Sequence, residues 1–207
     1  MAPRNKFTRD EMVAAAVRVV RAKGAGALTA RAVADELGVS TQPVFTCFST
    51  MDEAKREVRA AAEKIYDGYA EEGLRAEIPF YGFGTQFIRF ARDEPELYRL
   101  IFLTPAADGN NGAMEALEHS KGIVTESLKR IYNMNDSDAC RYFRDMWLVV
   151  YSLATLTVTG GCRYSDAEIG AILTGFSLSV CKAIKEIPGF TDGSFDRDAQ
   201  FRELIGK

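Results

Sequence analysis

Apolar positions recur at helical spacing along almost the whole chain. After the capping-box sequence Thr8-Arg-Asp-Glu11, Met12, Ala16 and Val19 lie on one helical face, and glycines at 24 and 26 end the segment. Only residues 148–159 are rich enough in β-branched side chains to suggest a strand, and they do not alternate. The pattern therefore predicts an all-α protein.

Residues 29–48, TARAVADELGVSTQPVFTCF, predict two short helices joined by a tight turn. Ala32, Val33 and Leu37 form the buried face of the first helix. Ala34 is small at the point where a second helix would cross closely. Gly38 stands where the turn needs positive φ. This spacing is typical of a DNA-reading helix-turn-helix, and an ordinary helical hairpin is the alternative.

The second of these helices is expected to begin at Ser40 as N-cap, with Pro43 in its first turn. Val44 and Phe48 would face inward. The polar side chains left outside can hydrogen-bond base edges or phosphates in a major groove: Thr41, Gln42 and Thr46.

The remaining two thirds predict a helical body. A second capping box, Thr50-Met-Asp-Glu53, begins a long helix over 51–73, with an apolar stripe of Val58, Ala62, Ile65 and Tyr69. An aromatic-rich helix follows Pro79, another starts near Pro95, and residues 104–112 form a loop. The later helices are expected at 113–132 (interrupted by Gly122), 137–159, 166–186 behind a third capping box at Ser165-Asp-Ala-Glu168, and near 196–205.

Composition supports a globular protein with a mildly basic amino-terminal part. The 207 residues carry a net charge of −3, yet residues 1–60 hold ten Lys and Arg against seven Asp and Glu. A basic module on an acidic body suits contact with phosphates at one end. No apolar run is long enough for a membrane span and no secretory signal is visible, so we expect a cytoplasmic protein without membrane contact.

The candidate chemistry for an enzyme is sparse. The four cysteines, at 47, 140, 162 and 181, form no Cys-x-x-Cys pair, and Gly82-Phe-Gly84 is no dinucleotide fingerprint. A carboxylate metal site would need Glu-x-x-His pairs, but Ala116 stands three residues before the single histidine, His119. We predict no catalytic residues, no metal ligands and no cofactor. The alternative is a helical-bundle ligand-binding protein or enzyme that no longer binds DNA. Glu115 and Glu118 lie on one helix, but helical Glu pairs are usually solvated surface.

The order of a capped first helix, a helix-turn-helix and a long following helix resembles the TetR family of bacterial transcription regulators. The resemblance is carried by FTRDEMVAAAVRVVRAKGAGALT and TARAVADELGVSTQPVFTCFSTMDEA. More weakly, ARDEPELYRLIF and MWLVVYSLATL resemble the WHG-type ligand-binding domain, although Tyr151-Ser152 replaces the usual His-Gly. The resemblance to the TetR family implies a DNA-binding domain at 1–50 and an effector-binding and dimerisation domain at 51–207.

Function and partners follow from the resemblance. It implies a homodimer that binds a double-stranded DNA operator, with repression relieved by a small molecule, or alternatively activation. The candidate DNA-binding residues lie in the arm and the helix-turn-helix: Arg4, Lys6, Thr29, Arg31, Ser40, Thr41, Gln42, Phe45 and Thr46. The family commonly has Tyr at Phe45 and Lys at Met51, so two phosphate contacts are lost here.

The effector is expected to be largely apolar, such as an aromatic or lipid-like molecule, and to bind between helices of the carboxyl-terminal domain. Ligand binding would shift the helix at 51–73 and change the separation of the two recognition helices. The candidate ligand-binding residues are aromatic or apolar and are predicted to face inward: Phe83, Phe87, Phe90, Tyr98, Phe102, Phe143, Met146, Trp147 and Tyr151. Packing of the same side chains into an ordinary core is the alternative.

Overall fold

The computed structural model describes residues 7–105 and 112–206, which contain helices and no strand. The all-α prediction is confirmed. The elements in chain order are α1 (Arg9–Lys23), η1 (Ala25–Ala27), α2 (Ala30–Leu37), α3 (Gln42–Cys47), α4 (Met51–Leu74), α5 (Pro79–Asp93), α6 (Pro95–Tyr98), the π-helical η2 (Arg99–Leu103), α7 (Gly112–Tyr132), α8 (Asp136–Val158), α9 (Asp166–Glu186) and α10 (Arg197–Leu204).

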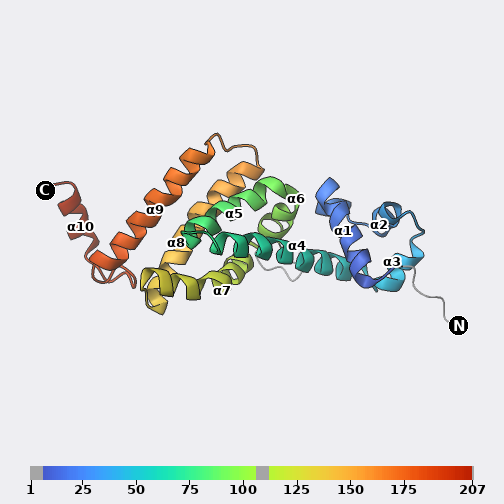
Figure 1. Cartoon of the computed structure of the whole chain (residues 1–207), viewed down its shortest axis with the longest axis horizontal. Coiled ribbons are helices and arrows are strands. Elements are labelled where there is room, and N and C mark those ends of the chain that lie inside the picture. Colours follow the sequence, from blue (N-terminus) through green and yellow to red (C-terminus); the bar gives the residue numbers. More distant parts are fainter. Residues whose placement is uncertain (1–6, 106–111, 207) are drawn as a thin grey trace.

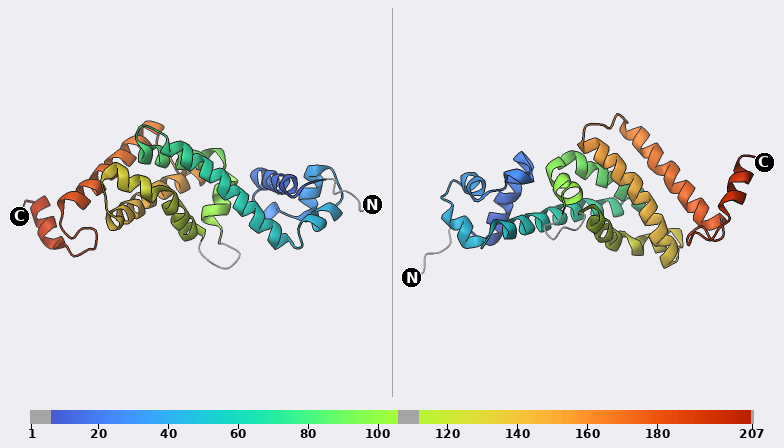
Figure 2. Two further views of the ribbon diagram at one scale, coloured as in Figure 1. Left: turned by 60° about the horizontal axis from the view of Figure 1, so that its bottom comes forward. Right: turned by 180° about the vertical axis from the view of Figure 1, so that it is seen from behind.

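The molecule is elongated, with a small head at one end and a larger body at the other (Figure 1). Helices α1 to α3 form the head, and α4 runs from the head into the body. Two further views show α8 and α9 side by side and α10 at the end of the molecule farthest from the head (Figure 2). Because α4 packs on both α1 and α5, it is shared by the head and the body.

Local sequence signals account for most helix starts. Thr8 Oγ1 accepts from the Glu11 backbone N–H and Glu11 Oε2 accepts from the Thr8 N–H, which completes the first capping box. The same reciprocal pair joins Ser165 and Glu168 at α9. Both predictions are confirmed.

Four local predictions were wrong. The Thr50 box is only half formed, because Glu53 accepts from the Ser49 N–H at 2.7 Å instead of closing back on Thr50. Gly122 does not interrupt α7, since a single glycine weakens a helix without breaking it. The buried stripe of α4 runs through Tyr66, whereas Ile65 and Tyr69 are half-buried. Ser40 does not cap α3; the N-cap position is Thr41, and its side chain makes no capping bond.

Two glycines allow α4 and α5 to cross in backbone contact. A Cβ atom on Gly73 would lie 2.6 Å from the carbonyl carbon and oxygen of Gly82, and a Cβ on Gly82 would meet the carbonyl of Gly73. No larger residue fits at either position without moving a helix. This crossing anchors the carboxyl-terminal end of α4 to the body.

Candidate DNA-binding surface and ligand cavities

The turn between α2 and α3 contains the left-handed glycine that its sequence predicts. Thr29 Oγ1 accepts from the Ala32 N–H at 3.1 Å and begins α2, and Gly38 ends it with φ of 65°. Val33, Val44 and Phe48 are fully buried, and α2 and α3 pack on α1 and on each other. The short helix α3 is therefore held by its apolar side, and its other side faces solvent.

The predicted DNA-reading side chains share one property, which is exposure to solvent. Phe45 is 56% exposed, and the others are also in the exposed class: Thr29, Arg31, Ser40, Thr41, Gln42 and Thr46. Within this set Thr46 Oγ1 donates to the Gln42 carbonyl at 3.0 Å, and Arg31 lies 3.8 Å from Asp35. Arg4 and Lys6 lie outside the described residues. These placements leave the DNA-binding assignment a prediction.

Arg9 ties the recognition helix to its neighbours, a role that sequence reasoning missed. Its guanidinium donates to the Cys47 carbonyl at 2.9 Å and bonds the carboxylates of Glu53 and Glu57. It also lies over the Phe48 ring, 5.6 Å from the centroid. The hydrogen bond from Arg9 lowers the pKa of Glu53, with help from the Ser49 N–H. One cation therefore joins α1, the end of α3 and the start of α4.

Arg59 makes the corresponding connection deeper in the body. Its Nη1 donates to the Leu100 carbonyl at 2.7 Å and its Nη2 to the Ile101 carbonyl at 2.9 Å, while Nε lies 3.4 Å from Glu63. The carbonyl groups at the end of a helix lack intrahelical partners, so a buried cation can satisfy them. Arg59 thus links α4 to η2.

The predicted ligand-binding residues form a closed aromatic cluster with Tyr66. Phe87 lies at its centre, 4.9 Å from Phe102 and 5.9 Å from Tyr98 between ring centroids. Tyr98 hydrogen-bonds Thr155 at 2.9 Å, and Tyr151 donates to the Phe102 carbonyl. Every candidate except the half-buried Tyr151 is buried: Phe83, Phe87, Phe90, Tyr98, Phe102, Phe143, Met146 and Trp147. In this conformation the rings mainly pack against one another, as in a protein core.

One donor in this cluster has no acceptor. The Trp147 indole stacks on Tyr151 at 4.8 Å, and its Nε1 is buried without a hydrogen-bond partner among the described residues. Buried indole N–H groups usually find a partner. Trp147 is therefore the cluster residue whose hydrogen bonding is incomplete.

An apolar cavity of about 360 Å³ lies beside the cluster, between α5, α8 and α9. Of the nine candidates only Met146 lines it. Gly84 provides part of the space, because a Cβ there would already lie 3.4 Å from Val150 and Leu173. The remaining wall is mostly apolar and comes from Ile78, Phe80, Tyr81, Tyr132, Val150, Leu173, Thr174, Ser177, Leu178 and Cys181.

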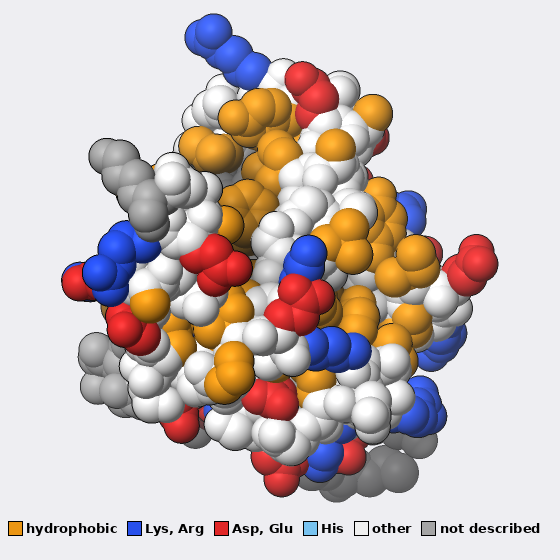
Figure 3. Space-filling model, turned by 90° about the vertical axis from the view of Figure 1, so that its left-hand side faces the viewer, with side chains coloured by type: hydrophobic (Ala, Val, Ile, Leu, Met, Phe, Trp, Pro, Cys, Tyr) orange, Lys and Arg blue, Asp and Glu red, His pale blue; other side chains and the backbone are white. Residues whose placement is uncertain are grey.

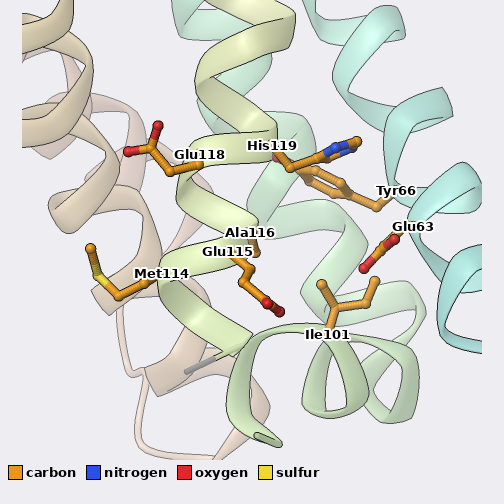
Figure 4. Close-up of a pocket in the computed structure, with 8 residues that line it drawn as sticks. All are labelled: Glu63, Tyr66, Ile101, Met114, Glu115, Ala116, Glu118 and His119. Atoms are coloured by element: carbon orange, nitrogen blue, oxygen red, sulfur yellow. The ribbon is translucent and has the colours of Figure 1, made fainter. Parts of the chain in front are cut away.

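A second cavity, of about 580 Å³, opens between α4, η2 and α7 and is acidic (Figure 4). Glu63 and Glu115 extend toward its space, whereas Glu118 points away and pairs with Lys121 at 2.6 Å. His119 contacts Asp67 at 2.6 Å on the rim. The carboxylates considered for a metal site therefore do not converge, and the described residues contain no metal-binding group of three.

One described helix, α9, has the length and mean hydropathy, 1.4, of a membrane span. Only 22% of its most apolar window is buried in the single chain. Helix α9 packs on α8 and α5, and its Ile169 and Leu173 are buried, while Phe176 and Leu178 are more than half exposed. Figure 3 looks onto the end of the molecule opposite the head, where apolar side chains gather in patches.

Comparison with known proteins agrees with this architecture. Residues 80–174 match the model of a tetracyclin repressor-like, C-terminal domain. No curated protein matches the chain.

Two solved structures share the fold over most of their length. A member of the TetR family from Streptomyces coelicolor A3 has a TM-score of 0.58 at 21% identity, covering 84% of this chain and 98% of that one. A protein from Mesorhizobium loti MAFF303099, described as a TetR-family transcriptional regulator, has a TM-score of 0.56 at 19% identity, covering 86% and 96%. Residues 80–174 therefore resemble a tetracyclin repressor-like, C-terminal domain, and the chain shares its overall fold with these two proteins.

Proposed function

We propose that this protein is a cytoplasmic, dimeric repressor that binds a DNA operator through α3 and leaves it when a small apolar ligand binds the body. The head, residues 1–50, would be the DNA-binding domain, and residues 51–207 the effector-binding and dimerisation domain. The observation that carries the proposal is the exposed polar side of α3, with Gln42 and Thr46 outward and Val44 buried behind them. Such side chains match the hydrogen-bonding groups of a major groove.

Dimerisation is supported by the uncovered apolar side chains of the last long helices. Leu148 and Leu156 on α8 are 51% and 41% exposed, and Phe176 and Leu178 on α9 are 51% and 66% exposed. A second copy packed on α8 and α9 would remove these side chains from water. It would also supply the second recognition helix that a palindromic operator requires.

Release by a ligand is supported by the continuous packing from the α5–α8–α9 cavity to the head. Helix α5 forms one wall of that cavity and crosses α4 at Gly73 and Gly82. Helix α4 in turn packs on α1. A small apolar molecule that enlarged this cavity would displace α5 and so favour a different α4 position, which is the requirement for coupling to the operator.

The proposal is tested by selecting bound duplexes from a random pool and measuring operator affinity by fluorescence anisotropy. Gln42→Ala and Thr46→Ala are each expected to weaken binding about 5- to 100-fold, because a good base contact contributes about 1–3 kcal/mol. Gln200→Ala, on α10 at the far end, is the matched control and should leave affinity unchanged. Selection of no preferred duplex, or equal affinity in all variants, would contradict the proposal.

A further inference from the structure

A separate cavity of about 450 Å³ lies where the head meets the body. Its apolar walls come from both parts. Val20 and Leu28 belong to the head, Val58 to α4 and Leu100 to η2, and all four are buried. This cavity shares no lining residue with the α5–α8–α9 cavity.

The opening of this junction cavity is cationic. Lys55, Arg56 and Arg59 line it together with one carboxylate, Asp52. Asp52 is paired with Lys55 at 2.8 Å, and Arg59 is engaged by the η2 carbonyls. Arg56 is exposed and, among the described residues, forms no salt bridge, although the hydrogen bond from Lys55 and, more weakly, the Arg56 charge lower the pKa of Asp52. A guanidinium beside an apolar wall is therefore available to an incoming anion.

We propose that the junction cavity binds an amphipathic organic anion, a carboxylate that carries an apolar chain. The carboxylate would contact Arg56 and Lys55, and the chain would cover Leu28, Val58 and Leu100. An inorganic anion would leave these apolar walls hydrated, and a neutral apolar molecule would leave the cations unused. A carboxylate with an alkyl chain satisfies both parts of the lining.

Such a ligand would contact the head and the body at once. Its chain would touch Leu28 on the head side and Leu100 on η2, so its affinity depends on the distance between them. The junction ligand is thus distinct from the apolar effector proposed for the body, and it would act directly on the head orientation.

The test is calorimetric titration of the full-length protein, without DNA, with decanoate below its micelle concentration. Decanoate is expected to bind at least tenfold more tightly than decanol, which lacks the charge. Arg56→Gln should weaken decanoate binding at least tenfold. Arg130→Gln, which removes an exposed arginine from α7, is the matched control and should change affinity less than twofold.

Two further variants identify which cavity is occupied. Gly26→Leu places a side chain at the junction cavity, where a Cβ meets no atom within 4 Å, and should weaken decanoate binding at least tenfold. Thr174→Phe occupies the α5–α8–α9 cavity and should leave decanoate binding unchanged. Circular dichroism confirms that each variant is folded.

Any of three results in the calorimetric titrations would overturn the inference. They are equal affinity for decanol, unchanged decanoate affinity in both Arg56→Gln and Gly26→Leu, and loss of binding in Thr174→Phe. An Arg56→Gln variant that loses duplex affinity but keeps decanoate affinity would also overturn it, because the cation would then serve DNA phosphates. The decanoate titrations contain no DNA, so their result is independent of the operator test above.

Discussion

Arg21 on α1 and Glu94 at the start of α6 form a two-bond ion pair, with Nε and Nη2 lying 2.8 and 2.6 Å from the two carboxylate oxygens. The Glu94 side chain is 16% exposed and that of Arg21 41%. This pair joins the head to the body without passing through α4. The position of the head therefore depends on a second connection besides the long helix.

Breaking the Arg21–Glu94 ion pair should increase the motion of the head relative to the body, with only a small loss in the free energy of unfolding. Glu94→Gln is expected to cost about 1 kcal/mol in unfolding free energy, because the Arg21 side of the pair is 41% exposed and water weakens such pairs. Amide hydrogen exchange at the carboxyl-terminal end of α1 should nevertheless accelerate. Arg18→Gln, which breaks the 2.6 Å pair with Glu36 inside the head, is the control. It should leave the rate of amide hydrogen exchange at that end of α1 unchanged.

The glycine crossing gives a sharper stability prediction within a single helix. Gly73→Ala should destabilise the protein by about 1–3 kcal/mol, because its Cβ would overlap the Gly82 backbone. Gly68→Ala, five residues earlier on α4, meets no atom within 4 Å and should stabilise by about 0.5–1 kcal/mol. Urea unfolding midpoints for both variants measure the difference, and a neutral Gly73→Ala would refute the close crossing.

Buried tyrosines predict loss of stability in alkali. Burial raises the pKa of Tyr66, Tyr98 and Tyr142 above the ordinary value of about 10. The folded state then holds protons that the unfolded chain releases. Its stability is complete below pH 10 and falls as pH rises above that value toward the folded-state pKa.

Urea midpoints measured between pH 8 and 11.5 test this dependence. Tyr142→Phe should flatten the alkaline decline, at some cost at neutral pH from the lost 2.7 Å bond to Ser177. Tyr164→Phe, at a half-exposed position, is the control and should keep the wild-type slope. An unchanged slope in Tyr142→Phe would count against the assignment of the alkaline loss of stability to the buried tyrosines.

The dimer proposal predicts that one charge on α9 will separate the protomers. Phe176 is 51% exposed, so Phe176→Glu should leave the monomer fold intact while placing a desolvated carboxylate in the proposed interface. Sedimentation should then report monomers. Ile131→Glu on α7, 39% exposed, is the control and should remain dimeric. Dimers in both variants would place the interface elsewhere.

The two departures from the family pattern, Phe45 and Met51, predict separable effects on DNA binding. Met51→Lys, at the first residue of α4, should raise operator affinity and steepen the dependence of log affinity on log salt by about 0.9 per new phosphate contact in each protomer. Phe45→Tyr on α3 adds a hydroxyl without charge. It should raise affinity and leave the salt slope unchanged, as measured by anisotropy between 50 and 200 mM salt.

The sequence alone determined several helix ends and the turn of the helix-turn-helix. The Thr8 and Ser165 capping boxes, the left-handed Gly38 and the buried Val44 could be predicted, because a cap or a turn is decided by residues within a few positions. The same reasoning predicted that Gln42 and its neighbours lie on an exposed surface.

Only the tertiary structure decided which distant residues meet. The Arg9 and Arg59 connections join residues about 40 positions apart, and the Gly73–Gly82 crossing depends on the angle between two helices. The buried stripe of α4 runs through Tyr66 because aromatic rings of two other segments, Phe87 on α5 and Phe102 on η2, pack against it. Inward-facing residues are recognisable from periodicity, but whether they close a core or line a cavity is decided by how completely neighbouring helices fill the space between them.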